Sequence, residues 1–228
     1  LSLICPIKNI FIVTNQDYFT LCKEQLPKID DTQILCEPVM RNTAPCIAYA
    51  AFKIHALNNN AKLIVAPSDH LIKDNEEFTK TIKQIFDTIV NKEYLVTLGI
   101  HPIRPDTGYG YIQFDETNIL DENNNIKKVK TFTEKPNKDL ALQFLDSGDF
   151  LWNAGIFAFT SEALINSFKK YLRDIYDIFL SGEDFYNTKK EQEFINRVFP
   201  SCKNISIDYG ILEKSDFVYV YPSSFGWS

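Results

Sequence analysis

The chain has 228 residues, of which 45% are hydrophobic and 24% charged, and its formal net charge is −6. These fractions are typical of a globular protein and exclude a disordered, collagen-like or low-complexity chain. A mildly acidic chain without a basic run is a poor candidate for binding nucleic acid, and no apolar stretch approaches the ~18 residues of a membrane span. We therefore expect neither nucleic acid nor a membrane as a partner.

The cysteines indicate the cellular compartment. There are five of them, scattered along the chain without a C-x-x-C pair or the spacing of a zinc site. Such a set is typical of free thiols in a reducing cytoplasm. The first nine residues, LSLICPIKN, have neither the basic start nor the apolar core of an export signal. The sequence therefore predicts a cytoplasmic protein.

Strand-like and helix-like patterns alternate in the first hundred residues. The predicted strands are 9–14, 33–37, 62–66 and 94–99. The predicted helices are 16–26, a second one that starts at Thr43 as N-cap and stops at Asn58, and a third one that Asp74 and Glu77 begin as a capping box. This alternation predicts a parallel sheet with crossover helices.

The periodicity changes in the second half of the chain. Longer strands are predicted at 111–114 and 126–134 around a turn at 123–125, followed by strands at 152–159 and 217–221. Helices are predicted at 138–146, ended by Gly148, and at 162–170, 174–180, 188–198 and 206–214. Neither a repeat nor a linker interrupts the pattern. We therefore expect residues 1–228 to form a single α/β domain.

Three segments follow predicted strands of the parallel sheet, where ligands of α/β proteins bind. They are Glu37–Thr43, Pro67–His70 and the loop after Gly99. Asp69, just beyond a buried strand, is well placed to hold Mg²⁺, which prefers one or two carboxylates together with phosphate oxygens. An Asp that merely caps the following turn gives the same pattern. The three segments together indicate one site.

Three further segments each permit a binding role and a structural one. Arg104–Gly110 contains two glycines that let a ligand approach the backbone, but it also reads as an ordinary turn. Glu134 and Lys135 offer an acceptor for sugar hydroxyls and a cation for phosphate, or form a solvated ion pair. Asn153 can bind a sugar hydroxyl beside a wall made by Trp152, or cap a strand next to a core tryptophan.

Seven segments in order resemble one family. They are EPVMRNTAP at 37–45, PSDH at 67–70, TGYGYI at 107–112, FTEKP at 132–136, LWNAGIF at 151–157, SIDYG at 206–210 and GWS at 226–228. Together they resemble the mannose-1-phosphate guanylyltransferases, most closely the bacterial type that is sometimes fused to a mannose-6-phosphate isomerase domain. The resemblance implies a Rossmann-like nucleotide-diphospho-sugar transferase fold, with a mainly parallel mixed sheet flanked by helices.

The resemblance also implies a reaction, in which GTP and mannose 1-phosphate give GDP-mannose and pyrophosphate. Asp69 would be the Mg²⁺ ligand and Lys135 would contact the sugar phosphate, and these are the two catalytic residues. The residues implied in nucleotide binding are Glu37, Arg41, Asn42, Thr43 and Ser68. The residues implied in sugar binding are Gly110, Tyr111, Glu134, Asn153 and Gly155. Alignment and charge neutralisation at the α-phosphate would suffice, without a protein nucleophile.

The choice of base follows from hydrogen bonding. Guanine presents two donors side by side, N1–H and N2–H₂, which one acceptor-only carboxylate can bind. Uracil and thymine present one N–H between carbonyls, which suits an amide. Glu37 stands where related uridylyl- and thymidylyltransferases tend to have Gln, so it favours guanine.

The sequence departs from the family at both ends. The family's glycine-rich loop, G-G-x-G-x-R-L-x-P, is absent, and the chain stops at Ser228, where the family continues to a second metal carboxylate. We therefore expect an apolar sheet edge to be exposed and these residues alone to be inactive. The alternatives are another sugar-1-phosphate nucleotidyltransferase and a non-catalytic module that binds sugar nucleotides. A homo-oligomer and a fused isomerase domain outside the chain stay open as partners.

Overall fold

The computed structural model describes residues 1–121 and 125–227. The chain folds into two compact units, which we call the first and second unit. The first unit comprises Leu1–Ala61 and Leu164–Ile211. The second unit comprises Lys62–Ala163 and the segment that begins at Leu212. Whether the two units act as the single domain that the sequence predicts stays a prediction.

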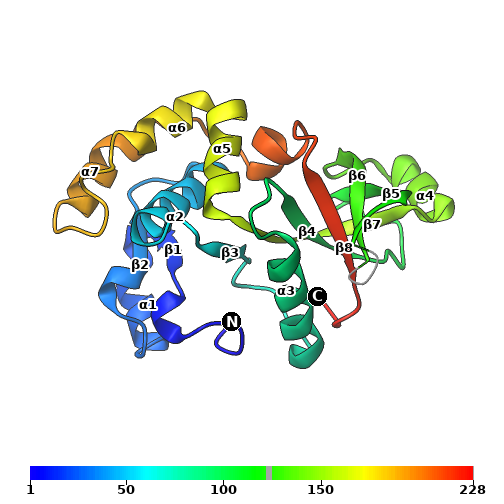
Figure 1. The fold of residues 1–228 in the computed structure, drawn as a ribbon, viewed down its shortest axis with the longest axis horizontal. Coiled ribbons are helices and arrows are strands. Elements are labelled where there is room, and N and C mark those ends of the chain that lie inside the picture. Colours follow the sequence, from blue (N-terminus) through cyan, green and yellow to red (C-terminus); the bar gives the residue numbers. More distant parts are fainter. Residues whose placement is uncertain (122–124, 228) are drawn as a thin grey trace. The chain divides into compact units, whose positions relative to one another are not determined.

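A two-stranded parallel sheet organises the first unit. Strands β1 (Ile12–Asn15) and β2 (Ile34–Glu37) pair in register, so that Asn15 lies opposite Glu37. Helix α1 (Phe19–Gln25) connects them, and Figure 1 shows the three elements together. The predicted parallel pair with a crossover helix is confirmed here. All residues of β2 are buried, whereas those of β1 are half-buried.

Helix α2 (Thr43–Leu57) follows β2 and buries one Ala-rich face. Its N-cap is Asn42 and not Thr43 as predicted, because the Oδ1 atom of Asn42 accepts a hydrogen bond from the backbone N–H of Thr43 at 2.8 Å. Thr43 is already helical. The remaining helices of this unit are α5 (Ser161–Tyr171, which begins in the second unit), α6 (Arg173–Leu180) and α7 (Glu191–Val198). Helix α6 packs on α2, and α7 packs on β2.

The second unit is built on a six-stranded sheet with the order β3-β7-β4-β8-β6-β5. The strands are β3 (Lys62–Val65), β4 (Leu95–Ile100), β5 (Tyr111–Asp121), β6 (Ile126–Thr133), β7 (Phe150–Thr160) and β8 (Val218–Ser223). Among the described pairings of this sheet only β4 and β8 are parallel. The α/β class is confirmed, but the expectation of a mainly parallel sheet is wrong.

The reason lies in β7. Strands β3 and β4 both run antiparallel to β7, so they are parallel to each other, as the helix between them, α3 (Asn75–Thr88), predicts. They are not neighbours, however, because β7 comes from much later in the chain and inserts between them. For β3 and β4, the alternation of elements thus indicated the strand directions correctly and the strand neighbours wrongly.

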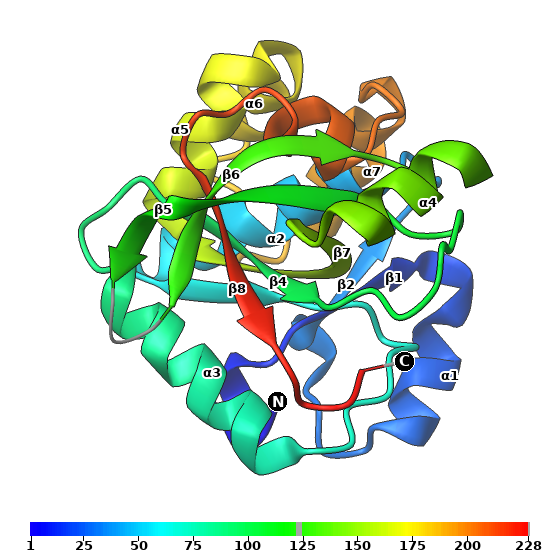
Figure 2. The ribbon, with the colours of Figure 1, turned by 90° about the vertical axis from the view of Figure 1, so that its right-hand side faces the viewer.

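Two helices cover the sheet of the second unit. Both α3 and α4 (Lys138–Ser147) contact β7. Figure 2 shows the two helices with the strands of this unit. The predicted cap of α3 is confirmed, because Asp74 accepts a hydrogen bond from the backbone N–H of Glu77 at 2.9 Å. Strand β5 extends to Asp121, well beyond its predicted end, and most of the predicted turn at 123–125 lies outside the described residues.

Three other findings concern the chain as a whole. The predicted helix at 206–214 is reduced to a π-helical turn, Asp208–Leu212. All five cysteines are free thiols. Within the described ranges, no helix combines the length and the apolar character that crossing a membrane requires.

Candidate functional site

The carboxyl group of Glu37 is the most unusual polar group of the first unit. Glu37 ends the buried strand β2 and is only 9% exposed. Its Oε1 atom is buried and has no hydrogen-bond partner among the described residues. Burial raises the pKa of this carboxyl to about 7, and a hydrogen bond with the Cys46 thiol acts in the opposite direction. A buried acceptor without a donor costs free energy unless a ligand supplies one.

Arg41 brings an unpaired donor to the same region. Its Nη2 atom donates to the backbone carbonyl of Pro200 at 2.5 Å, but its buried Nε has no partner among the described residues. The charges of Arg41 and Glu37 both act on the pKa of Cys202, which burial raises to about 12, so the three side chains lie near one another. An unpaired acceptor and an unpaired donor in the same region suit a ligand that carries both kinds of group.

The start of α2 is already partly occupied. The backbone of Asn42 has a φ of 67°, a value that residues other than glycine rarely adopt. The backbone N–H groups of Thr43 and Ala44 donate to Asn42 Oδ1 and to the carbonyl of Ile205, and the Thr43 hydroxyl accepts from the N–H of Ile207 at 2.9 Å. Part of the donor set that a helix N-terminus offers to a phosphate is therefore used within the protein.

In the second unit, Gly110 and Glu134 lie in direct contact. They flank the paired residues Tyr111 of β5 and Thr133 of β6. A Cβ atom at Gly110 would lie only 2.5 Å from Oε2 of Glu134. Only glycine therefore lets the carboxylate approach this backbone so closely. The backbone N–H of Asn153 donates to the carbonyl of Gly110 at 2.8 Å, which brings the third predicted sugar-binding residue to the same place.

Asn153 is held by neighbours that the sequence did not indicate. Its Oδ1 atom accepts hydrogen bonds from the Thr97 hydroxyl at 2.9 Å and from the backbone N–H of Gly155 at 3.2 Å. Thr97 is fully buried in the apolar strand β4, and a lone polar residue in such a strand is the signal that could have found it. Tyr111 is also fully buried, so any contact with a sugar would have to come from its backbone.

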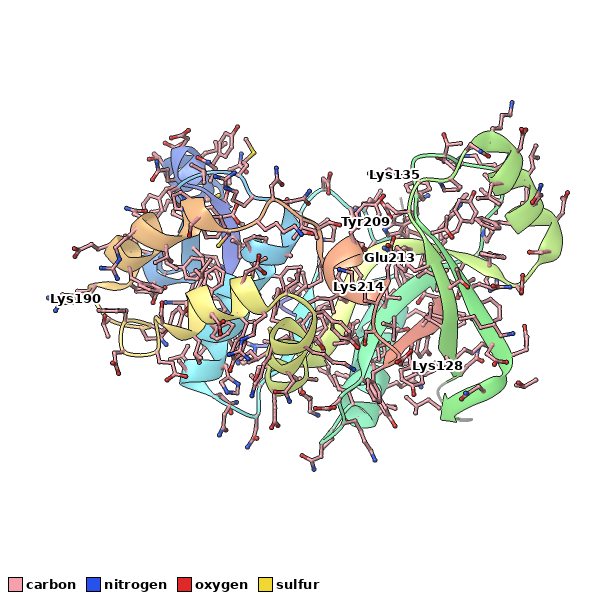
Figure 3. All side chains as sticks on the ribbon, turned by 90° about the horizontal axis from the view of Figure 1, so that it is seen from above. Lys128, Lys135, Lys190, Tyr209, Glu213 and Lys214 are labelled. Carbon is pink, nitrogen blue, oxygen red and sulfur yellow. The ribbon has the colours of Figure 1, made fainter. Side chains whose placement is uncertain are left out.

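Lys135 lies at the exposed end of β6, and Figure 3 shows it with Glu213 and Lys214. Its Nζ lies 3.4 Å from Oε1 of Glu134, and 63% of the side chain is exposed. Its φ of 46° is again in the left-handed region. Burial and then the charge of Glu134 raise the pKa of Glu213, so Glu213 is a further acidic neighbour that the sequence did not indicate.

The Pro67–His70 loop reaches the same strand end through Gly155. A Cβ at Gly155 would lie 3.7 Å from Pro67 and 3.8 Å from His70, and the φ of 66° at Gly155 also favours glycine. Ser68 and Asp69 are exposed between these two contacts. Nδ1 of His70 accepts a hydrogen bond from the indole of Trp227 at 3.1 Å, so the structure ties this loop to the C-terminal segment as well.

A chain of aromatic rings connects the loops of the second unit. The ring of Tyr109 lies 5.1 Å from that of Trp227 and 5.2 Å from that of Trp152. The guanidinium of Arg104 lies 5.2 Å from the Trp152 ring and also pairs with Asp106. Trp152 is buried, which supports its structural role, and the Arg104–Gly110 segment is an ordered loop that positions Gly110.

The carboxylate of Asp69 is suited to be a Mg²⁺ ligand. Its carboxylate is exposed and accepts no hydrogen bond from any described residue. No group of three or more His, Cys, Asp or Glu side chains gathers as a metal cage in the described ranges. Mg²⁺ is usually held by one or two carboxylates and by phosphate oxygens of the substrate, so a single free carboxylate is a suitable ligand.

The structure thus gathers the predicted residues into two groups. Gly110, Glu134 and Asn153 meet at one end of the β5, β6 and β7 strands, and Gly155 connects them to the Pro67–His70 loop. Glu37 and Arg41 form the other group, in the first unit. The prediction that both groups serve one ligand stays a prediction.

Comparison with known proteins defines the class. The family model described as "Nucleotidyl transferase" matches residues 3–199 of the chain. Because the match covers most of the chain, the protein belongs to the nucleotidyl transferase family. This agrees with the α/β fold and with the polar groups at the strand ends.

The names of individual relatives point to one group within this family. The mannose-1-phosphate guanylyltransferase of Salmonella montevideo is 36% identical over 228 residues, which cover 95% of this chain and 46% of that protein. A crystal structure from Thermus thermophilus, described as a mannose-1-phosphate geranyltransferase, is 25% identical with a TM-score of 0.86 and matches 100% of this chain and 63% of that one. The resemblance predicted from the sequence is confirmed.

A second solved structure similar to this chain has an isomerase in its description. It is described as a mannose-6-phosphate isomerase from Helicobacter pylori, is 27% identical with a TM-score of 0.77, and matches 97% of this chain and 84% of that one. The chain spans about half the length of the curated relatives it matches.

Proposed function

We propose that the protein transfers GMP from GTP to mannose 1-phosphate, giving GDP-mannose and pyrophosphate. Membership of the nucleotidyl transferase family supports the class of reaction. The names of the relatives support mannose 1-phosphate as the acceptor. In the reaction, a phosphate oxygen of the sugar forms a bond to the α-phosphorus of GTP while the bond to the β-phosphate breaks, and pyrophosphate leaves with the electron pair.

One observation carries the choice of base, the buried and unpaired Oε1 of Glu37. N1–H and N2–H₂ of guanine would supply the donors that this carboxylate lacks. The unpaired Nε of Arg41 supports the same reading, since guanine O6 is an acceptor beside those donors. Asn42, Thr43 and Ser68 complete the proposed nucleotide site.

On the sugar side, Glu134 and Asn153 would orient the mannose. The Glu134 carboxylate would accept hydrogen bonds from the sugar hydroxyls, and the Asn153 amide would donate one to them. Gly110 would present its backbone to the ring, beside Tyr111 and Gly155. Lys135 would neutralise the charge of the sugar phosphate. Because the sugar phosphate and the α-phosphate of GTP are both anionic, this reduces their repulsion and favours their alignment. The contact of Gly110 with Glu134 supports this arrangement.

Asp69 would hold Mg²⁺ with its free carboxylate. When bound, the ion supplies positive charge that offsets the negative charge of the phosphates. Ser68 precedes Asp69 in the same exposed loop and would contact the phosphates beside it.

The nucleotide preference of the Glu37→Gln variant tests the proposal. An amide offers one donor and one acceptor, so it matches uracil or thymine better than guanine. We expect the wild type to bind GTP more tightly than UTP and the variant to lose this preference, by about tenfold to hundredfold. Isothermal titration calorimetry with each nucleotide and Mg²⁺ measures it.

Glu24→Gln is the matched control, because Glu24 is exposed on α1 of the same unit and should leave the preference unchanged. GTP selectivity that survives in Glu37→Gln would remove Glu37 from the account. Tighter binding of UTP than of GTP by the wild type at every pH would contradict the proposed function itself.

A further inference from the structure

We propose that Glu37 reads nucleotide bases in two protonation states, so that the protein's selection of guanine over uracil is proton-coupled and increases as the carboxyl ionises. The inference rests on the proposed function and concerns the same site. It begins from the geometry of Glu37, which combines burial, an unpaired oxygen and the absence of a paired cation among the described residues.

The surroundings of Glu37 favour the neutral acid in the free protein. The side chain forms no ion pair with any described residue, and the nearby guanidinium of Arg41 is used by the carbonyl of Pro200. The Glu37 side chain forms a hydrogen bond with the thiol of Cys46, which is a weak donor. A carboxylate buried without a cation or strong donors is costly, so it takes up a proton.

The groups that pack around Glu37 are mostly uncharged. Strand β1 places Asn15 opposite it, α2 contributes Cys46, and α7 contributes Gln192, whose amide donates to the carbonyl of Cys36 at 3.0 Å. Titratable groups that act on the pKa values of this region include Cys22, Cys36, Cys46, Cys202, Arg41 and Asp174. The surrounding helices also carry Lys23 and Glu24 on α1, Tyr49, Lys53 and His55 on α2, and Glu191, Glu193 and Arg197 on α7. Burial raises the pKa values of Cys36, Cys46 and Cys202, so these three thiols stay neutral near pH 7.

The two forms of the carboxyl group suit different bases. The carboxylate has acceptors only and matches the two adjacent donors of guanine. The neutral acid has one acceptor and one O–H donor, the pattern of an amide, and it matches the N–H and the neighbouring carbonyl of uracil. Guanine binding therefore expels the proton, whereas uracil binding retains it.

The direction of the pH dependence follows. Burial raises the pKa of Glu37 to about 7, so the acid prevails below neutral pH and the carboxylate above it. Affinity for guanine should rise about tenfold per pH unit below 7 and level off above it, and affinity for uracil should fall about tenfold per unit above 7. The GTP-to-UTP affinity ratio should rise about a hundredfold between pH 6 and pH 8.

Calorimetric titration of the full-length protein with GTP and with UTP from pH 6 to pH 8.5 tests the inference. The triphosphate titrates in both nucleotides, so its effect cancels in the ratio. Phosphate and Tris buffers, which differ in ionisation enthalpy, report the proton released. Near pH 7 we expect Glu37 to release about half a proton per GTP and to take up about half a proton per UTP, so the two nucleotides should differ by about one proton.

The Glu37→Gln variant should lose both effects, because the amide has one charge state, and Glu24→Gln should keep them. If Glu37→Gln does not fold, the carbon-13 resonance of the Glu37 carboxyl in the wild type replaces it, and we expect this signal to titrate near pH 7 in the free protein. A GTP preference with a constant ratio would overturn the inference and leave the proposed function standing. An absence of nucleotide binding at every pH would overturn the function.

Discussion

The contact between Gly110 and Glu134 shows how one missing side chain shapes the candidate sugar site. The carboxylate of Glu134 occupies the space where any other residue at position 110 would place its Cβ. The same carboxylate lies beside the ammonium of Lys135 and acts on the pKa of Glu213. The absence of a side chain at position 110 therefore leaves room for the Glu134 carboxylate in this position.

Gly110→Ala should disturb this position. The added Cβ would force the Glu134 side chain away, and a hydrogen bond to a charged group contributes about 1.5–3 kcal/mol. We expect affinity for mannose 1-phosphate to fall about tenfold to hundredfold with GTP affinity unchanged, measured by calorimetry.

The matched control is Gly108→Ala in the same loop, where the new Cβ would meet only the carboxylate of Asp106, at the longer distance of 3.2 Å. Equal losses in both variants would mean that the loop as a whole had moved. An unchanged sugar affinity in Gly110→Ala would contradict the role of Glu134.

At this scale the sequence indicates residue types well and their partners poorly. Glu37, Asp69 and Glu134 could be chosen from the sequence because each is a carboxylate at or just beyond the end of a predicted strand. That Asn42 rather than Thr43 caps α2 could not be predicted, because both residue types are good caps and only the backbone decides. Thr97 was missed because its partner Asn153 is 56 positions away in the sequence.

Among the elements, α2 and α7 are joined by a buried polar cluster. Glu191 on α7 accepts two hydrogen bonds from Nζ of Lys53, at 2.8 and 2.6 Å, and one from the Tyr49 hydroxyl at 2.7 Å. It also accepts from the backbone N–H of Asn187 at 2.6 Å. Lys53 and Glu191 are both buried, so each charge is stabilised by the opposite charge of the other. The cluster fixes α2, whose start carries the proposed nucleotide residues.

Replacing Glu191 by Gln should leave the Lys53 ammonium buried without a counter-charge. Breaking a buried ion pair in this way costs about 3–5 kcal/mol, and urea denaturation measures the loss. The double variant Lys53→Met, Glu191→Leu should recover most of it, because it removes both charges. A single variant as stable as the wild type would show that the pair contributes nothing to the fold.

The elements also show where prediction from the sequence ends. Strand and helix types were predicted along most of the chain, since periodicity and caps are local signals. The insertion of β7 between β3 and β4 could not be predicted, because sheet order depends on contacts between residues nearly a hundred positions apart. The register of β5 against β6 and β7, which brings Gly110 to Glu134 and Asn153, is non-local in the same way.

For the molecule as a whole, the two units divide the proposed chemistry. The first unit carries the residues proposed to read the base, and the second carries those proposed to hold the sugar, its phosphate and Mg²⁺. The family explains why both kinds of residue belong to one chain, since nucleotidyl transfer joins a nucleotide to its acceptor.

Product formation by the full-length protein tests the central claim most directly. Phosphorus-31 NMR would follow GTP or UTP incubated with Mg²⁺ and either mannose 1-phosphate or glucose 1-phosphate. We expect GTP with mannose 1-phosphate to give GDP-mannose and pyrophosphate in equal amounts, faster than any other pair. A faster reaction of UTP with glucose 1-phosphate, or nucleotide binding without pyrophosphate release from any pair, would contradict the account.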